Sequence, residues 1–329
     1  MHQTHMSGGS LKVIKRALST ALLTVTVFML VVAPAVAQKP AERPRAQTRQ
    51  NDDTKIGVTT VRLPITVKEK SKFVTGLVEG NFEVYEDSKR QKIDKFISPS
   101  ELPLNIAVLM DTSNSVKLKL PFEKDAAEDF VATVTKYRKS DQVLFATFDS
   151  EVELHQDFTD AQEPLIRAIR KVKAGGVTRL YDGVYRVIEE KMANLQGSDA
   201  RRIIVILSDG NDTASERSLK EAIEMAQRYD VTVFGISTKN FRGITSGTTE
   251  TVDDKELRQL CEQTGGQVFL PSQKIELFRA FSQVAQDLRQ EYVIFYTPQN
   301  QNKTGKRREI KVKLVRADGR LYHKQGYVF

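Results

Sequence analysis

Two kinds of hydrophobic periodicity divide the chain into β and α/β regions. The first begins at Val61, where apolar residues recur at every second position, a pattern typical of a half-buried strand. Pro64 lies inside this run and predicts an edge strand, because proline cannot donate a ladder hydrogen bond. Shorter strand patterns follow at 82–85 and 93–97, with glycines and acidic residues at the turns. Residues 55–100 therefore predict a small antiparallel, β-sandwich-like segment.

The second kind of pattern begins at Leu104, where short apolar runs alternate with segments of helical periodicity. These runs are apolar on both faces, as the strands of a parallel sheet covered by helices must be. They lie at 106–110, 143–148, 203–207, 231–236 and 267–270. The run at 152–158 follows its predecessor after only three residues, which is too short for a crossover and predicts an antiparallel edge strand. Residues 101–290 therefore predict a doubly wound, mostly parallel, Rossmann-like α/β domain.

The segments between these strands carry apolar residues at helical spacing. Pro121 stands at a first-turn position, where its missing N–H costs nothing. The apolar stripe of this first helix consists of Phe122, Ala126, Phe130, Val134 and Tyr137. Similar stripes at 219–226 and 278–288 complete the alternation of strand and helix.

Near the C-terminus the pattern returns to β. Alternating apolar and charged residues at 310–314 predict a strand, and a glycine marks a turn before the last strand-like segment. Neither β region is long enough to bury a core alone. We therefore expect 55–100 and 291–329 to form one β-sandwich-like domain, with the α/β domain of 101–290 inserted between them.

The N-terminus has the three parts of a secretory signal peptide. A basic region at 12–16 precedes an apolar run at 17–32, and the Ala-Val-Ala sequence at 35–37 is a small-residue cleavage signal. We expect residues 1–37 to be removed and the mature protein to be periplasmic or secreted. The alternative is an uncleaved anchor, because the apolar run is nearly long enough to span a bilayer. Residues 38–54 are polar and aperiodic, which predicts a disordered linker.

Composition adds few constraints to this picture. Hydrophobic residues make up 40% and charged residues 28% of the chain, as in ordinary globular proteins. The formal charge of +8 falls to +5 once the three basic residues of the signal peptide are removed. A solvated turn explains the tight basic run at 306–308 as well as a nucleic-acid patch does. An exported protein also rarely meets nucleic acid, so we expect no nucleic-acid partner. Cys261 is the only cysteine, so no internal disulfide is expected.

Oxygen-bearing side chains follow the predicted strands at one edge of the α/β sheet. They are Asp111, Ser113, Ser115, Thr178 and Asp209. Ligands of doubly wound sheets collect at the carboxyl ends of the strands. Alternate residues of an extended turn point the same way, so the first three side chains can converge. The glycine pair at 175–176 lets the neighbouring loop approach closely. Oxygen ligands suit hard cations, so the set predicts Mg²⁺, or else Mn²⁺ or Ca²⁺.

Taken one at a time, the same residues have a simpler interpretation as caps of helices or turns. Asp149, Asp182 and Asp212 also lie near this edge, where we expect them to support turns, helix starts or ligands rather than to bind metal directly. The set of five residues, in this order and at these strand ends, favours metal binding.

These five positions resemble the metal-ion-dependent adhesion site (MIDAS) of von Willebrand factor type A (VWA) domains. The resemblance covers about 104–290 and includes a D-x-S-x-S sequence, a threonine after a glycine pair and an aspartate in a Ser-Asp-Gly turn. The flanking segments at 73–77 and 82–87 resemble an exported bacterial subgroup of the family. The resemblance implies a bound Mg²⁺ or Mn²⁺ with an open coordination position, which takes a carboxylate from a protein partner. It implies adhesion-type binding rather than turnover.

Two other functions compete with this one. A metal-dependent hydrolase needs a general base, and the chain after the signal peptide contains only His155 and His323. No G-x-S-x-G elbow and no phosphate-binding P-loop is present in the sequence, although Asp and Glu remain candidate bases. We therefore expect a protein that is not an enzyme. The second competitor is an envelope scaffold whose metal only stabilises the domain.

Overall fold

The computed structural model describes residues 60–70, 72–98, 102–195, 200–239, 252–302 and 305–328. All of them belong to one compact unit, residues 56–329. The predicted signal peptide (1–37) and linker (38–54) lie outside the described residues. Among the helices that are described, none has the length and hydrophobicity needed to cross a membrane.

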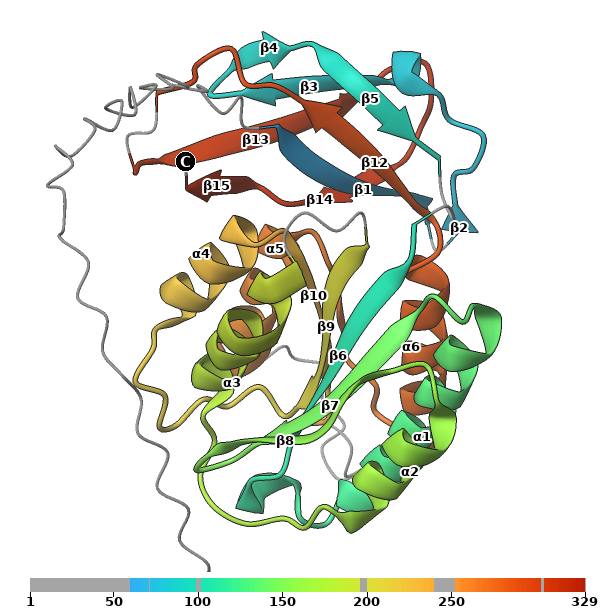
Figure 1. Ribbon diagram of the computed structural model, residues 1–329, viewed down its shortest axis with the longest axis vertical. Helices are drawn as coiled ribbons and strands as arrows, with labels where there is room; N and C mark the ends of the chain where they lie inside the picture. Colours follow the sequence, from blue (N-terminus) through green and yellow to red (C-terminus); the bar gives the residue numbers. More distant parts are fainter. Residues whose placement is uncertain are drawn as a thin grey trace, which may run out of the picture. The chain divides into compact units, whose positions relative to one another are not determined.

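A six-stranded mixed sheet forms the centre of the α/β region (Figure 1). Its strands are β6 (Leu104–Asp111), β7 (Gln142–Phe148), β8 (Val152–Thr159), β9 (Arg201–Ser208), β10 (Val231–Ser237) and β11 (Val268–Phe269). They lie in the order β11-β10-β9-β6-β7-β8, and every neighbouring pair is parallel except β7 and β8. The predicted antiparallel strand is therefore confirmed, because the short link between β7 and β8 permits only a hairpin.

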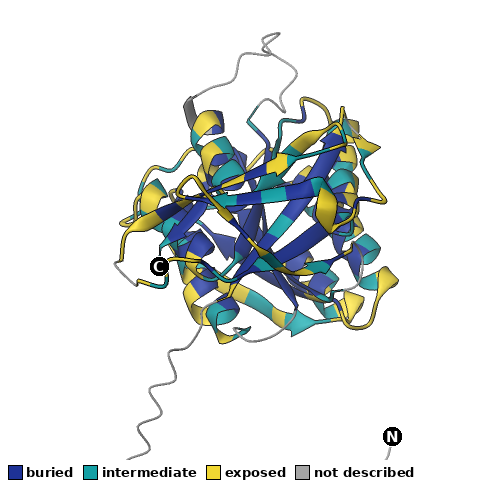
Figure 2. Ribbon diagram, turned by 90° about the horizontal axis from the view of Figure 1, so that it is seen from above, coloured by how far each residue is buried: buried dark blue, intermediate teal, exposed yellow. Residues whose placement is uncertain are grey.

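Helices cover both faces of this sheet (Figure 1). One face packs against α1 (Leu120–Tyr137), α2 (Gln162–Lys171) and α6 (Lys274–Asp287), and the other against α3 (Leu180–Val187), α4 (Leu219–Arg228) and α5 (Val252–Thr264). Short turns of other helix types are η1 (Glu79–Asn81), η2 (Asn114–Val116), η3 (Ile188–Met192) and η4 (Ala193–Leu195). Successive strand residues point to opposite faces, so strands apolar at every position are buried on both sides. Figure 2 shows the buried residues inside the molecule and exposed residues on the outer faces of its helices.

The buried face of α1 differs from the predicted stripe. Its buried residues are Leu120, Glu123, Ala126, Ala127, Phe130, Val131 and Val134. Phe122 and Tyr137 are instead exposed. Lys274 lies over the Phe122 ring and Arg289 over the Tyr137 ring. The two aromatic rings therefore contact cationic side chains at the helix surface rather than the core.

The segments before and after the α/β region form two antiparallel sheets. One has the order β14-β1-β12-β5, with β2 paired to β1, and the other has the order β15-β13-β3-β4. Their strands are β1 (Val61–Glu69), β2 (Lys72–Phe73), β3 (Phe82–Glu86), β4 (Lys89–Gln91), β5 (Ile93–Ile97), β12 (Glu291–Tyr296), β13 (Arg307–Leu314), β14 (Arg320–His323) and β15 (Gly326–Val328). Each sheet takes strands from both regions, and one apolar cluster contains side chains from both sheets. The domain boundaries at 55–100 and 291–329 stay predictions.

Strand β1 is internal to its sheet, so the edge position predicted from Pro64 is wrong. β1 pairs with β12 along 61–66 but with β14 only along 65–68. Pro64 therefore lies opposite Val293 on one side and beyond the end of β14 on the other. A proline is tolerated at this internal strand because its missing N–H interrupts no pairing with β14.

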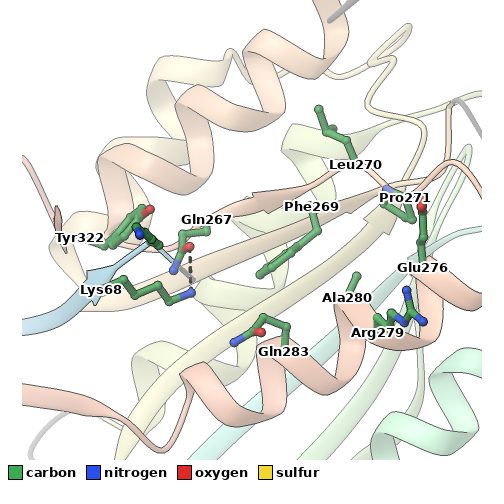
Figure 3. A pocket seen from close by; sticks show the side chains of 11 residues that line it. Lys68, Gln267, Phe269, Leu270, Pro271, Glu276, Arg279, Ala280, Gln283 and Tyr322 are labelled. Carbon is green, nitrogen blue, oxygen red and sulfur yellow. Dashed lines mark hydrogen bonds between the residues drawn. The ribbon is translucent and has the colours of Figure 1, made fainter. Parts of the chain in front are cut away.

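A buried polar cluster joins β1 to the last helix of the α/β region. Lys68 of β1 forms a buried ion pair with Asp287 at the end of α6. The side-chain amides of Gln267 and Gln283 donate to the same carboxylate at 3.0 and 2.6 Å. Figure 3 shows Lys68, Gln267 and Gln283 of this cluster at a hollow lined from β1, β11, α6 and β14. The volume of this hollow is about 400 Å³. A buried charge is costly unless it is paired and hydrogen-bonded, so the cluster holds α6 against β1.

Candidate metal centre

Three loops at the carboxyl ends of the strands carry the five candidate ligands. Asp111 is the last residue of β6, and Asp209 directly follows β9. Because β6 and β9 are parallel neighbours in register, these two residues leave the sheet side by side. Ser113 and Ser115 lie in the turn after β6, and Thr178 lies in the third loop, just before α3. The fold thus places all five at one edge of the sheet, as predicted.

Asp111 is fully buried and is held by two hydrogen bonds. Its Oδ1 accepts from the Ser113 N–H at 2.8 Å, and its Oδ2 accepts from the Ser208 hydroxyl at 2.7 Å. The hydroxyl oxygens of Ser113 and Ser115 lie 2.8 Å apart. Three of the five predicted ligands therefore form one hydrogen-bonded group. Burial raises the pKa of Asp111 to about 6; the two hydrogen bonds oppose this shift, and the negative charge of Asp209 adds to it.

The loop that carries Thr178 is hydrogen-bonded to the turn after β6. The backbone N–H and the side-chain amide of Asn114 both donate to the Gly176 carbonyl, at 3.2 and 3.0 Å. Gly176 has a φ of +77°, and a Cβ there would lie 2.6 Å from the Ser150 hydroxyl oxygen. Only glycine fits this close approach. Thr178 itself is buried, and its N–H donates to the Thr213 hydroxyl at 3.1 Å.

Asp209 shows most directly that the site suits a cation. Its Oδ1 is buried and forms no hydrogen bond with any described group, and its Oδ2 lies 3.8 Å from the Lys119 ammonium. A buried carboxylate oxygen without a donor is costly unless water or a cation satisfies it. Within the described residues, no three His, Cys, Asp or Glu side chains gather into a metal-binding group. Hydroxyl and water oxygens would therefore complete the shell of an ion, and such a set fits a hard divalent cation.

The other carboxylates of this edge are occupied by hydrogen bonds. Asp149 accepts from a threonine hydroxyl at 3.0 Å. Asp182 accepts from two backbone N–H groups at 2.9 and 3.1 Å. Asp212 accepts from a backbone N–H at 3.1 Å and from a serine hydroxyl at 2.5 Å. All three hold loops in place, as predicted for residues of turns and helix starts.

Sequence reasoning missed four buried polar residues around this site, Ser208, Lys119, Glu123 and Thr238. Ser208 could have been found from the sequence, because it stands directly before Asp209 at the end of an apolar strand. Glu123 could also have been found, because it places a charge on the buried face of α1. Nothing in the sequence points to Lys119, since most lysines of a globular protein lie at the surface.

Glu123 makes the stability of the metal-free protein depend on pH. Burial raises the pKa of this carboxyl from 4.5 to about 8, and the charges of Asp111 and Asp209 add to the shift. Between these two pH values the unfolded chain loses the proton that the folded chain retains, so stability falls as the pH rises through this window. The side-chain amide of the Glu123→Gln variant does not ionise, so this variant lacks the pH dependence that Glu123 causes. We expect it to be more stable than wild type by on the order of a few kcal/mol at pH 8, with a smaller difference at pH 5.

Urea unfolding with EDTA at both pH values measures this difference. Asp129→Asn, which removes an exposed carboxylate of the same helix, is the matched control and is expected to follow the wild type. A Glu123→Gln variant whose stability differs from wild type by the same amount at pH 5 and pH 8 would show that Glu123 does not titrate in this window.

The family model of the von Willebrand factor type A domain matches residues 105–286, which is more than half of the 329-residue chain. This chain belongs to the VWA domain family. The match contains all five candidate ligands and confirms the predicted family. VWA domains commonly hold a divalent metal at a MIDAS and bind protein ligands through it. A comparison with curated proteins gives no match.

Solved structures that resemble this VWA protein come from different sources. Proximal thread matrix protein 1 from the mussel byssus is 20% identical, with 59% of this chain and 49% of that chain covered and a TM-score of 0.46. A further structure of that protein has a zinc-occupied MIDAS motif. A von Willebrand factor type A protein from Catenulispora acidiphila is 12% identical, with 81% and 72% covered and a TM-score of 0.46.

An aerotolerance-related membrane protein from Bacteroides fragilis, with multiple mutations to serine, is also 12% identical. The alignment covers 56% of this chain and 98% of that chain, with a TM-score of 0.45. This VWA chain thus spans about half the length of the mussel protein and nearly all of the B. fragilis structure.

Proposed function

We propose that this VWA domain binds a divalent cation and, through it, an acidic group of a protein partner. The proposed ligands are Asp111, Ser113, Ser115, Thr178 and Asp209. The observation that carries the proposal is the buried Asp209 Oδ1, which has no hydrogen bond with a described group and belongs to the same edge as the hydrogen-bonded D-x-S-x-S group. Mg²⁺ is the proposed ion, with Mn²⁺ and Ca²⁺ as alternatives that accept the same oxygen ligands.

The charges of these ligands explain why the partner group should be acidic. Two carboxylates and neutral hydroxyls leave a bound divalent ion with affinity for another anionic oxygen. Ser115 is exposed, whereas Asp111 and Ser113 are buried. We therefore propose that the partner carboxylate approaches from the side of Ser115.

A binding role is favoured over hydrolysis by where the histidines lie. His155 is on β8, where its Nε2 is 2.8 Å from the Thr147 hydroxyl. His323 is on β14, where its Nδ1 is 2.8 Å from the Lys324 carbonyl. Neither histidine belongs to the candidate metal centre, so neither supplies a general base there.

We also propose that the protein is exported and that 55–100 and 291–329 form a β-sandwich-like domain that carries the VWA domain. The basic, apolar and small-residue parts of 1–37 support export. The apolar cluster shared by the two antiparallel sheets supports a common β domain. In this arrangement 38–54 is the linker between the cleavage site and the folded protein.

Binding to a library of acidic peptides, in Mg²⁺ or in EDTA, tests the proposed function. Each peptide has a matched version with Asn and Gln in place of Asp and Glu. We expect binding of acidic peptides in Mg²⁺, loss of binding in EDTA, and loss in Asp209→Ala. Asp129→Asn, which alters an exposed carboxylate of α1, is the control and is expected to bind normally.

Equal binding in EDTA, or equal binding of the Asn and Gln peptides, would contradict a metal-bridged carboxylate. The scaffold alternative predicts a different result, in which Asp209→Ala unfolds at a lower temperature but, while folded, binds the same peptides as wild type.

A further inference from the structure

Lys119 is a buried cation at the candidate metal centre. It is the N-cap residue of α1, its side chain is 8% exposed, and its Nζ lies 3.8 Å from the Asp209 Oδ2. Lysine is rarely buried without a partner, and within the described residues Asp209 is its ion-pair partner. One proposed metal ligand therefore already lies beside a positive charge that belongs to the protein.

Glu123 lies one helical turn further along α1. Its backbone N–H donates to the Lys119 carbonyl at 3.1 Å, so the two side chains are i, i+4 neighbours on one face of the helix. Glu123 is 1% exposed, and neither of its carboxylate oxygens forms a hydrogen bond with a described group. The hydroxyl of Thr238 lies close enough to the Glu123 carboxyl to lower its pKa, although the geometry between the two groups falls short of a full hydrogen bond. Glu123 is thus a buried carboxyl one helical turn from Lys119, and it forms no ion pair with another described residue.

A divalent ion held by Asp209 would repel the Lys119 ammonium. Like charges a few ångströms apart in a partly buried site repel strongly, because water screens them poorly. The Lys119 side chain is buried, so its ammonium cannot reach bulk water unless the whole side chain is rearranged. The Glu123 carboxyl, by contrast, lies on the same face of α1 as Lys119. The geometry therefore offers Lys119 two acidic groups: the Asp209 carboxylate, and the Glu123 carboxyl, which burial keeps protonated in the metal-free protein and which an adjacent ammonium would ionise.

We propose that Lys119 competes with the divalent cation for Asp209, and that Lys119 turns to Glu123 when Asp209 serves as a metal ligand. Lys119 and Glu123 are positioning residues, which set the metal affinity of the site without contacting the metal. This inference rests on the proposed function, because it requires Asp209 to be a metal ligand. The opposite account is that Lys119 orients Asp209 and so strengthens metal binding.

Calorimetric titration with MnCl₂ distinguishes the two accounts. We expect Lys119→Met to bind Mn²⁺ about tenfold more tightly than wild type, because the competing charge is gone. Lys119→Arg keeps the charge and is expected to stay close to wild type. Glu123→Gln is expected to bind about tenfold more weakly, because Lys119 loses its second partner. In the double variant Lys119→Met/Glu123→Gln, the Glu123 change is expected to have no effect.

Two exposed residues supply matched controls, Lys117→Met in the same turn and Asp129→Asn on the same helix. Both are expected to bind Mn²⁺ like wild type, and thermal unfolding in EDTA shows whether each variant is folded. Equal or weaker binding by Lys119→Met overturns the proposal. So does a Glu123→Gln effect that persists in the Lys119→Met background, since Glu123 would then act on the metal without Lys119. If wild type binds no Mn²⁺, the proposed metal site itself is wrong, and the inference falls with it.

Discussion

Asp111→Ala is expected to abolish binding of Mg²⁺ and Mn²⁺ to this protein. Asp111 is fully buried and organises the centre, because it accepts hydrogen bonds from Ser113 and Ser208. The alanine variant loses a proposed carboxylate ligand and the acceptor that orients the serine turn. Loss of a supporting residue alone typically weakens metal binding 10–100-fold, so the loss of this ligand should exceed about 100-fold. Isothermal titration with either ion measures the change.

The control for Asp111→Ala is Asp129→Asn, which alters an exposed carboxylate of α1. This variant is expected to bind metal like wild type, and circular dichroism should show native secondary structure in both variants. If folded Asp111→Ala binds Mn²⁺ with the wild-type affinity, the assignment of Asp111 as a ligand is wrong.

Glu86→Ala is expected to lower the free energy of unfolding by about 3 kcal/mol or more, the largest loss of stability among the variants proposed for this protein. In the β sheets, the buried Glu86 carboxylate accepts from the hydroxyls of Tyr296 and Tyr327, each at 2.8 Å, and from Arg308 at 2.7 Å. Its removal leaves a buried guanidinium without its carboxylate and two phenols without this acceptor. Urea unfolding at pH 7 measures the free energy of unfolding.

Glu83→Ala on the same strand is the control for Glu86→Ala. Glu83 accepts from the Tyr85 hydroxyl at 2.8 Å, and its side chain is 23% exposed in an ion pair with Arg90. Exposed ion pairs contribute at most about 1 kcal/mol, so the loss should be small. Equal losses for the two variants would mean that the buried cluster adds nothing specific. While folded, both variants are expected to keep wild-type affinity for Mn²⁺.

The sequence predicts the α/β layers well, because strands apolar on both faces can be buried only between helices. The short link between β7 and β8 likewise leaves one orientation for β8. Predictions that depend on neighbours elsewhere in the chain were wrong. Pro64 is typical of an edge strand, and only the structure shows that β14 pairs with β1 at 65–68 and not at Pro64. Phe122 and Tyr137 fit a helical stripe, yet cationic side chains from α6 and from the turn after it keep them at the surface.

The residues of the candidate site likewise fall into those that the sequence predicts and those that only the structure shows. The five candidate ligand positions can be named from the sequence because they lie at strand ends or in the loops beside them, where side chains of doubly wound sheets meet. Lys119 and Glu123 cannot be assigned in this way. Their place at the site comes from the position of the start of α1, which brings the Lys119 ammonium within 3.8 Å of the Asp209 carboxylate. Only the folded chain shows that contact.

Diffraction from crystals grown with MnCl₂, recorded at the manganese absorption edge, tests the central claim most directly. We predict one anomalous peak at the carboxyl ends of β6 and β9. The manganese ion at this peak is expected to lie within coordination distance of oxygens from the D-x-S-x-S turn and to bind Asp209 directly or through a water molecule. An anomalous map without a peak there, from crystals whose manganese lies elsewhere on the protein, would contradict the account.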